Sequence, residues 1–172
     1  MVHIYTGAGK GKTTAALGLS FRAAGRGRKV LFLEFLKDGN SGEVLLAKSV
    51  PNIDIRCFQT TVGGFFWNMT EAEKEKLITE SQTGFSYAVQ CAENGLCHML
   101  VLDEIAGCIA NGLILEDDVL RFLKAYGQST EIVLTGRDFS EALLSAADYV
   151  SEIHAVKHPF ETGIPPREGI EF

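Results

Sequence analysis

The feature that most constrains the fold is a glycine-rich stretch near the start of the chain, between an apolar run and a helical pattern. The apolar run covers residues 2–5, and small apolar residues at helical spacing cover 13–24; between them the chain has Gly7-Ala8-Gly9-Lys10-Gly11-Lys12-Thr13-Thr14. Three glycines let the backbone curl so that successive amide N–H groups point into one concavity, and the following helix adds its positive end. This pattern predicts a strand, a phosphate-binding loop and a helix in succession.

Two side chains complete the expected phosphate site. Lys12 supplies a mobile cation for phosphate oxygens, and the Thr13 hydroxyl is placed to ligate Mg²⁺. The usual pattern has a glycine six positions before Lys12, where this chain has Thr6, so the match is imperfect at its first position and strong in the rest. The alternative is a turn that merely joins strand to helix, but such a turn needs fewer glycines and no lysine followed by two threonines.

Short apolar runs alternate with helical patterns along the rest of the chain. We expect strands at residues 2–5, 30–33, 53–58, 99–102, 132–134 and 149–153, and helices at 13–24, 40–48, after Thr70, at 115–126 and at 140–146. Thr70 and Glu73 have the spacing of a capping box. Continuous apolar strands separated by helices indicate an α/β fold, with a mainly parallel β-sheet covered by helices on both faces. We expect a single domain over residues 1–172, whose tail, 157–172, packs on the surface as an irregular strap.

The composition excludes several classes of protein. Hydrophobic residues make up 46% of the 172 residues and charged residues 22%, which is ordinary for a globular chain and unlike a disordered one. The formal charge of −6 argues against a nucleic-acid partner, which needs a basic face. No apolar run reaches the ~20 residues of a membrane span and no leader is visible, so we expect a cytoplasmic protein with no membrane partner. Four cysteines lack metal-site or redox spacing and are interpreted as small, reduced, buried hydrophobes: Cys57, Cys91, Cys97 and Cys108.

Charged side chains follow two of the later expected strands. Asp103 and Glu104 end the run 99–102, and Arg137 follows the run 132–134. Ligands of parallel sheets sit at the carboxyl ends of the strands, and a carboxylate there holds Mg²⁺ directly or through water. Together with the loop, this indicates a magnesium–nucleotide site. For Arg137, spacing alone favours a ligand contact and an ordinary surface arginine about equally.

Several stretches, in order over nearly the whole chain, resemble the ATP:corrinoid adenosyltransferases of the CobA/BtuR type. Each stretch is a weak match alone, but the ordered set is specific. They are GKGKTTAA at 9–16, RAAG at 22–25, FLK at 35–37, GFFW at 64–67, VLDE at 101–104, LTGR at 134–137, DYVSE at 148–152, KHPF at 157–160 and GIEF at 169–172.

The resemblance implies a RecA-like P-loop fold, a homodimer and a reaction other than phosphoryl transfer. A reduced Co(I) corrinoid, supplied with electrons by an external donor such as a flavoprotein, attacks the 5′ carbon of ATP, and inorganic triphosphate leaves. Lys12 and the loop amides then stabilise the leaving triphosphate, and Thr13 and Glu104 correspond to the Mg²⁺ contacts; these three side chains are the implied catalytic residues. The implied binding residues are Gly7, Ala8, Gly9, Lys10, Gly11, Lys12, Thr13, Thr14, Arg22, Phe65, Trp67 and Arg137.

Phe65 and Trp67 match the pair of aromatics that, in this family, crowd the lower face of the corrin and displace its axial ligand. A lower ligand raises the cobalt orbital that accepts an electron, so apolar rings that exclude the ligand and water ease the reduction. Composition alone favours a different interpretation, in which Phe65, Phe66 and Trp67 form a hydrophobic plug over the core. The resemblance is what favours the corrinoid role.

Three departures from the family pattern affect the expected site. Ala8 replaces a polar residue that usually reaches the ribose, and Glu34 stands where glutamine is common. The chain begins six residues before Gly7, so we expect a more open site than in members whose N-terminal extension closes over it. Two alternatives stay open: a P-loop NTPase or small-molecule kinase that cleaves at the γ-phosphate, and a non-catalytic binder of nucleotide or corrinoid.

Overall fold

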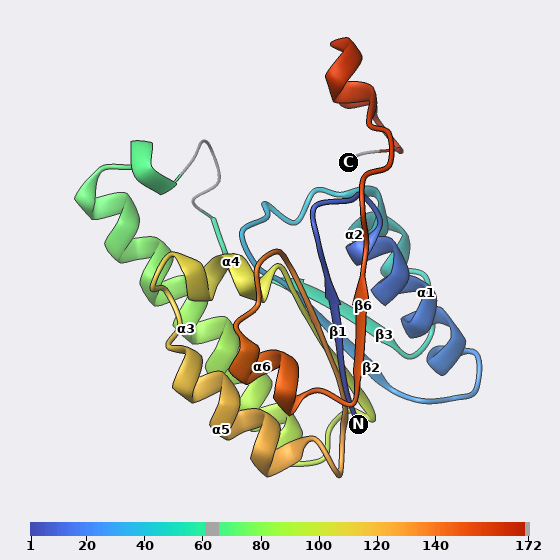
Figure 1. Cartoon of the computed structure of the whole chain (residues 1–172). Coiled ribbons are helices and arrows are strands. Elements are labelled where there is room, and N and C mark those ends of the chain that lie inside the picture. Colours follow the sequence, from blue (N-terminus) through green and yellow to red (C-terminus); the bar gives the residue numbers. More distant parts are fainter. Residues whose placement is uncertain (61–65, 171–172) are drawn as a thin grey trace.

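The computed structural model describes residues 1–60 and 66–170, except for the Trp67 side chain. Within these residues, six strands form one sheet in the order β3-β2-β4-β5-β1-β6, and every pairing is parallel (Figure 1). The strands are β1 (Val2–Thr6), β2 (Val30–Glu34), β3 (Ile53–Cys57), β4 (Met99–Asp103), β5 (Glu131–Thr135) and β6 (Tyr149–Glu152). The α/β fold with a parallel sheet, predicted from the sequence, is confirmed.

Helices cover both faces of this sheet. Two lie on one face, α1 (Lys12–Ala24) and α2 (Gly42–Ala47), and four lie on the other, α3 (Glu71–Glu93), α4 (Ile105–Ala110), α5 (Glu116–Tyr126) and α6 (Glu141–Ala146) (Figure 1). Two 3-10 turns, η1 (Phe66–Asn68) and η2 (Pro159–Thr162), complete the described elements. The larger apolar core lies between the sheet and α3–α6, and the smaller one lies under α1 and α2.

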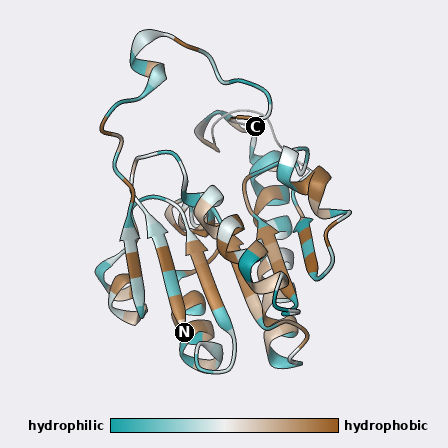
Figure 2. Cartoon of the chain, turned by 90° about the vertical axis from the view of Figure 1, so that its right-hand side faces the viewer, coloured by the Kyte–Doolittle hydropathy of each residue, from teal (hydrophilic) through white to brown (hydrophobic). Residues whose placement is uncertain are grey.

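The central strands have continuous apolar sequences because helices cover them on both faces. Every residue of β2 and β4 is buried, including the acids that end them, Glu34 and Asp103. Figure 2 shows these inner strands as predominantly hydrophobic ribbons. Helix α3 begins at the predicted capping box, in which the Thr70 hydroxyl accepts from the Glu73 N–H and the Glu73 carboxylate accepts from the Thr70 N–H.

The strand order determines where a ligand site can form. The connection from β1 runs through α1 to β2, and the connection from β4 runs through α4 and α5 to β5, on the opposite face of the sheet. Connections that diverge in this way leave a crevice at the carboxyl edge, which is where open α/β sheets bind ligands. Because β5 lies between β1 and β4, the loop after β1 and the acids at the end of β4 meet across the end of β5.

Two segments differ from the sequence-based expectation. Helix α4 was not predicted, because its six residues are too few to display a helical period. The tail does not lie flat on the surface: residues 159–170 are exposed, and this segment projects beyond the carboxyl edge of the sheet (Figure 1). Its end returns to the glycine-rich loop, where Lys10 Nζ donates to the Ile170 carbonyl at 2.8 Å.

Two further expectations concern the thiols and the membrane. Cys91, Cys97 and Cys108 are buried and Cys57 is half-buried, and all four thiols are free. Among the helices of the described chain, none has both the length and the apolar character needed to cross a bilayer.

Candidate active site

The backbone of the glycine-rich loop packs against the residue that follows β6. The Gly9 N–H donates to the Ile153 carbonyl at 2.7 Å. Gly7 has φ of 101°, and a Cβ at this position would lie 2.5 Å from the same carbonyl oxygen, so a larger residue does not fit. Gly11 has φ of 121° and turns the chain into α1; a Cβ there would meet nothing within 4 Å, so the backbone conformation is what favours glycine. The glycines therefore allow close packing at one end of the loop and a left-handed turn at the other.

Lys12 is buried within the loop. The residue is 7% exposed, and its Nζ donates to the carbonyls of Gly7 at 2.7 Å and Gly9 at 3.0 Å. Burial lowers the pKa of Lys12, and the nearby Glu104 carboxylate opposes this shift. In this conformation Lys12 therefore ties the loop together. A phosphate in the loop would compete with the two carbonyls for the ammonium group.

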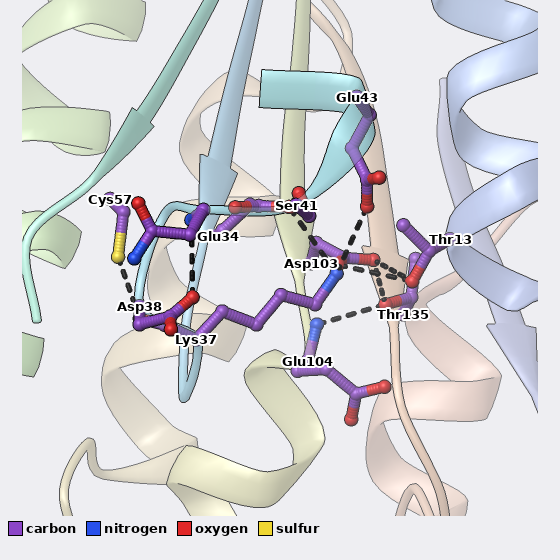
Figure 3. A network of polar contacts seen from close by, with 11 residues as sticks. Thr13, Glu34, Lys37, Asp38, Ser41, Glu43, Cys57, Asp103, Glu104 and Thr135 are labelled. Carbon is purple, nitrogen blue, oxygen red and sulfur yellow. Dashed lines mark hydrogen bonds and ion pairs between the residues drawn. The ribbon is translucent and has the colours of Figure 1, made fainter. Parts of the chain in front are cut away.

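Two hydroxyl groups converge on the carboxylate of Asp103 (Figure 3). Thr13 Oγ1 lies 3.0 and 3.1 Å from the two Asp103 oxygens and donates to them, and Thr135 Oγ1 donates to Oδ1 at 2.7 Å. The Glu104 N–H donates to Thr135 Oγ1 at 2.9 Å. Because Asp103 takes the hydroxyl hydrogen of Thr13, the lone pairs of Thr13 Oγ1 are left for a cation. The network joins α1, β4 and β5.

The same carboxylate is also paired with a lysine that follows β2. Lys37 Nζ lies 2.7 Å from Asp103 Oδ2, 3.3 Å from Glu34 Oε1 and 3.7 Å from Glu43 Oε1. Burial lowers the pKa of Lys37, but the carboxylates of Asp103 and Glu34 outweigh burial and hold this pKa above the ordinary lysine value. Lys37 is therefore a charged member of the site.

Glu104 occupies a strained position at the start of α4. Its φ is 60°, in the left-handed region that residues other than glycine seldom adopt, and its carboxylate points away from Asp103 (Figure 3). Burial first, and the charge of Asp103 second, raise the pKa of Glu104, while Lys12 opposes the rise. Leu36 and Asp138, which follow β2 and β5, also have positive φ. Strain of this kind gathers at functional sites.

A cleft of about 510 Å³ brings most of the predicted site residues together. Those that line it are Ala8, Gly9, Lys10, Gly11, Lys12, Thr13, Thr14, Glu104 and Arg137. Lys37 and Glu43 form part of its wall, and His158, Gly169 and Ile170 reach it from the tail. Gly7 is not among the residues that line the cleft, but its carbonyl accepts from Lys12 Nζ at 2.7 Å.

Three of the predicted binding residues are not placed in this cleft. Arg22 is exposed in the last turn of α1, about 15 Å along the helix from Lys12. Phe65 and the Trp67 side chain lie outside the described residues. Phe66 is half-buried against the larger core, with Lys74 Nζ 5.7 Å from its ring centroid. Phe66, the one aromatic side chain of this run that the structure describes, therefore fits the hydrophobic plug that composition favours.

Sequence reasoning missed one residue of the cleft wall, Lys37, to which it gave no role. It named Asp103 and Glu104 together as candidate magnesium ligands, but it assigned the metal contact to Glu104 alone, whereas the structure places the Asp103 carboxylate beside Thr13. The register of the sheet pairs Glu34 with Asp103 across β2 and β4, so two buried acids end neighbouring strands. Two acids at the ends of apolar strands, with a lysine three residues after the first, are the signal in the sequence for a buried ion cluster.

The donor set suits Mg²⁺ when a nucleotide supplies further ligands. The Thr13 hydroxyl and the carboxylates of Asp103 and Glu104 are hard oxygen donors of the kind Mg²⁺ prefers. Nowhere do the described residues place three or more His, Cys, Asp or Glu side chains so that they could hold a metal ion by themselves. A Mg²⁺ ion at Thr13 therefore needs phosphate oxygens and water to complete its coordination.

Comparisons with known proteins identify the family of this chain. The profile of a family described as ATP:corrinoid adenosyltransferase BtuR/CobO/CobP matches residues 1–172. A protein of Pseudomonas aeruginosa named corrinoid adenosyltransferase is 31% identical over 170 residues, which cover 98% of this chain and 82% of that protein. A corrinoid adenosyltransferase of Sinorhizobium sp is 33% identical, over 100% of this chain and 80% of that protein. The corrinoid adenosyltransferase CobA of Salmonella typhimurium is 31% identical, over 100% of this chain and 85% of that protein.

Proposed function

Because the chain belongs to the ATP:corrinoid adenosyltransferase family BtuR/CobO/CobP, we propose that the cleft beside the glycine-rich loop binds the triphosphate of ATP during adenosyl transfer. The chain is a transferase that moves the adenosyl group of ATP to a corrinoid, and the NTPase or kinase alternative is not favoured. The observation that carries the proposed site is the convergence of the loop, Lys12, Thr13, Glu104 and Arg137 on one cleft at the carboxyl edge of the sheet.

The chemistry we propose is attack of a Co(I) corrinoid on the 5′ carbon of ATP. The bond from that carbon to its oxygen breaks, the cobalt–carbon bond forms, and inorganic triphosphate leaves with the electron pair. Negative charge grows on the triphosphate in this step, so the catalytic need is for fixed donors around the leaving group. The loop amides of Gly9 to Thr13 and the Lys12 ammonium supply them, and Lys12 exchanges its two loop carbonyls for phosphate oxygens when ATP binds.

We assign Mg²⁺ to Thr13 and Glu104, with Asp103 as the group that orients Thr13. The ion would neutralise part of the triphosphate charge. Support comes from the hydrogen bonds of Thr13 to Asp103, and from Glu104, which lines the same cleft as Lys12. Arg137 lines this cleft and suits a phosphate, whereas Arg22 lies too far along α1 to share that role.

The remaining features of the proposal come from the family resemblance. We propose one domain over residues 1–172, a homodimer, and an external electron donor that delivers Co(I). Phe65 and Trp67 are proposed to crowd the lower face of the corrin. If so, Trp67→Ala lowers the rate that starts from Co(II) about tenfold more than the rate that starts from chemically prepared Co(I), because only the first requires loss of the axial ligand. An equal loss in both assays would reassign Trp67 to packing or general corrinoid affinity.

The experiment that tests the activity is anaerobic incubation of the protein with ATP, Mg²⁺ and chemically reduced cobalamin. We expect the corrin spectrum to change to that of a cobalt–carbon bonded product at a rate proportional to enzyme concentration. A spectrum that never changes, with protein that binds both substrates, would favour the non-catalytic binder.

A further inference from the structure

We propose that Lys37 is a positioning residue for the metal–nucleotide end of the cleft: its ammonium group holds Asp103 in the orientation that receives the hydroxyl hydrogen of Thr13. This inference rests on the proposed function and adds a residue to it. Within the described chain the ammonium group of Lys37 pairs with Asp103, Glu34 and Glu43, and Thr13 donates to Asp103, so the link from Lys37 to a cation at Thr13 passes through Asp103 (Figure 3).

The path of Lys37 toward Asp103 is fixed by the backbone before it. Leu36 has φ of 56°, in the left-handed region, so the chain turns sharply at the end of β2. A Cβ at Gly107 on α4 would lie 2.6 Å from Leu36 Cδ1, so a larger residue there would require the Leu36 side chain to move. The extended Lys37 side chain then crosses the ends of the strands to reach Asp103 (Figure 3). The turn at Leu36 therefore directs the Lys37 side chain toward the Asp103 carboxylate.

The Glu34 carboxylate also pairs with the ammonium group of Lys37. Glu34 is 1% exposed, and its Oε1 lies 3.3 Å from Lys37 Nζ and 3.4 Å from the Ser41 hydroxyl. Its Oε2 is buried and has no hydrogen-bond partner within the described chain. A buried carboxylate with one oxygen unpaired is costly, and the cation beside it is what compensates. Glu34 and Asp103 are register partners on β2 and β4, so the ammonium group sits between two buried acids at the strand ends.

Two accounts of Lys37 predict effects of opposite sign on a divalent cation. If Lys37 acts only through its charge, removing the charge lowers the repulsion felt by a cation at Thr13, and the cation binds more tightly. If Lys37 positions Asp103, removing it lets the carboxylate rotate, the Thr13 hydroxyl loses its fixed acceptor, and the cation binds more weakly. Loss of groups that orient a metal ligand typically costs 10- to 100-fold in metal affinity.

The test is the affinity of the protein for Mn²⁺ in the presence of ATP, measured from the water-proton relaxation that rises when the Mn²⁺–ATP complex binds to protein, because ATP in solution already removes the free ion. We expect Lys37→Met to weaken Mn²⁺ binding at least about tenfold. The matched control is Lys74→Met, because Lys74 pairs with Glu71 at 2.8 Å and is 26% exposed, against 25% for Lys37, but lies on α3 away from the cleft. The control should bind Mn²⁺ like the wild type. Unchanged or tighter binding by Lys37→Met would overturn the proposal.

A second variant separates positioning from folding, because Lys37→Met alone leaves two buried acids without their cation. Glu34→Gln combined with Lys37→Met removes one charge of each sign and relieves that penalty while Asp103 still lacks its ammonium partner. We expect this double variant to melt close to the wild type and to retain the weak Mn²⁺ binding. A double variant that folds and binds Mn²⁺ normally would refute the role of Lys37.

The failure of this inference is distinguishable from failure of the proposed function. Wild-type protein that binds Mn²⁺ with ATP but forms no adenosylated corrinoid would contradict the function and leave the role of Lys37 standing. Wild-type protein that forms the product, while Lys37→Met binds Mn²⁺ normally, would contradict the role of Lys37 alone.

Discussion

The two edges of the sheet each carry a hollow, and the smaller hollow is the better candidate for a site. The hollow at the amino edge is about 860 Å³ and is lined in part by Met1, Arg28, His98 and Glu131. The cleft at the carboxyl edge is about 510 Å³. Volume alone would therefore direct attention to the wrong end of the strands.

The edges differ in how their charges are held. At the amino edge the charged groups are largely exposed: the Met1 amino group lies 3.8 Å from Glu131, with side chains 55% and 40% exposed. At the carboxyl edge Lys12, Glu34 and Asp103 are buried. Burial of charges is costly, and it persists only where other groups compensate. Buried charges that converge on one cleft therefore indicate a site better than empty volume does.

The largest expected effect comes from removing the buried cation of the loop. Lys12→Ala should lower turnover by about 10²- to 10³-fold, because a donor to the leaving triphosphate is lost. The same substitution at the amino edge, Lys29→Ala, removes an exposed lysine and should leave turnover within about twofold of the wild type. Steady-state rates with saturating corrinoid measure both. Equal rates for the two variants would contradict the assignment of the active site to the carboxyl edge of the sheet.

A smaller effect is expected from the hydroxyl that Asp103 orients. Thr13→Val keeps the shape of the side chain and should raise the Mg²⁺ concentration for half-maximal activity about 10- to 100-fold. Thr83→Val on α3, where the hydroxyl donates to the Thr79 carbonyl at 2.7 Å, is the control and should not change the Mg²⁺ requirement. A Thr13→Val protein with an unchanged requirement would remove Thr13 from the metal site.

The smallest effect concerns stability. Burial, opposed by Lys37, raises the pKa of Glu34 above the ordinary glutamate value of 4.5. The folded chain therefore binds this proton more tightly than the unfolded chain does, and the free energy of unfolding falls as pH rises from 4.5 through the folded pKa. Glu34→Gln should thus increase the free energy of unfolding at pH 7.5 by about 1 kcal/mol and give no gain near pH 4. Urea titrations at both pH values measure this, and a loss at pH 7.5 would contradict the buried-charge account.

Local patterns predicted most of the fold. The strands could be predicted because short apolar runs are bounded by polar residues. The start of α3 could be predicted because Thr70 and Glu73 have the spacing of a capping box, in which each side chain bonds the backbone N–H of the other. Helix α4 could not be predicted, because it is short and apolar and because Glu104, which precedes it, has a left-handed backbone conformation that no local propensity favours.

The site was predictable only in part, because its decisive contacts join residues distant in sequence. The loop motif identified Lys12 and Thr13, but the acceptor of the Thr13 hydroxyl depends on the strand order, which places β5 between β1 and β4. Residue spacing does not encode that order. The reach of Lys37 depends on a backbone turn at Leu36, whose positive φ is contrary to the local preference of leucine.

The central claim is that the carboxyl-edge cleft holds triphosphate as a leaving group, and the inorganic product tests this most directly. Transfer of the adenosyl group breaks the bond between carbon 5′ and its oxygen, so all three phosphates depart together. Phosphorus NMR of a completed reaction should show intact triphosphate, equal in amount to the adenosylated corrinoid and absent when reduced corrinoid is omitted. Formation of ADP and phosphate without corrinoid turnover would contradict the account and indicate cleavage at the γ-phosphate.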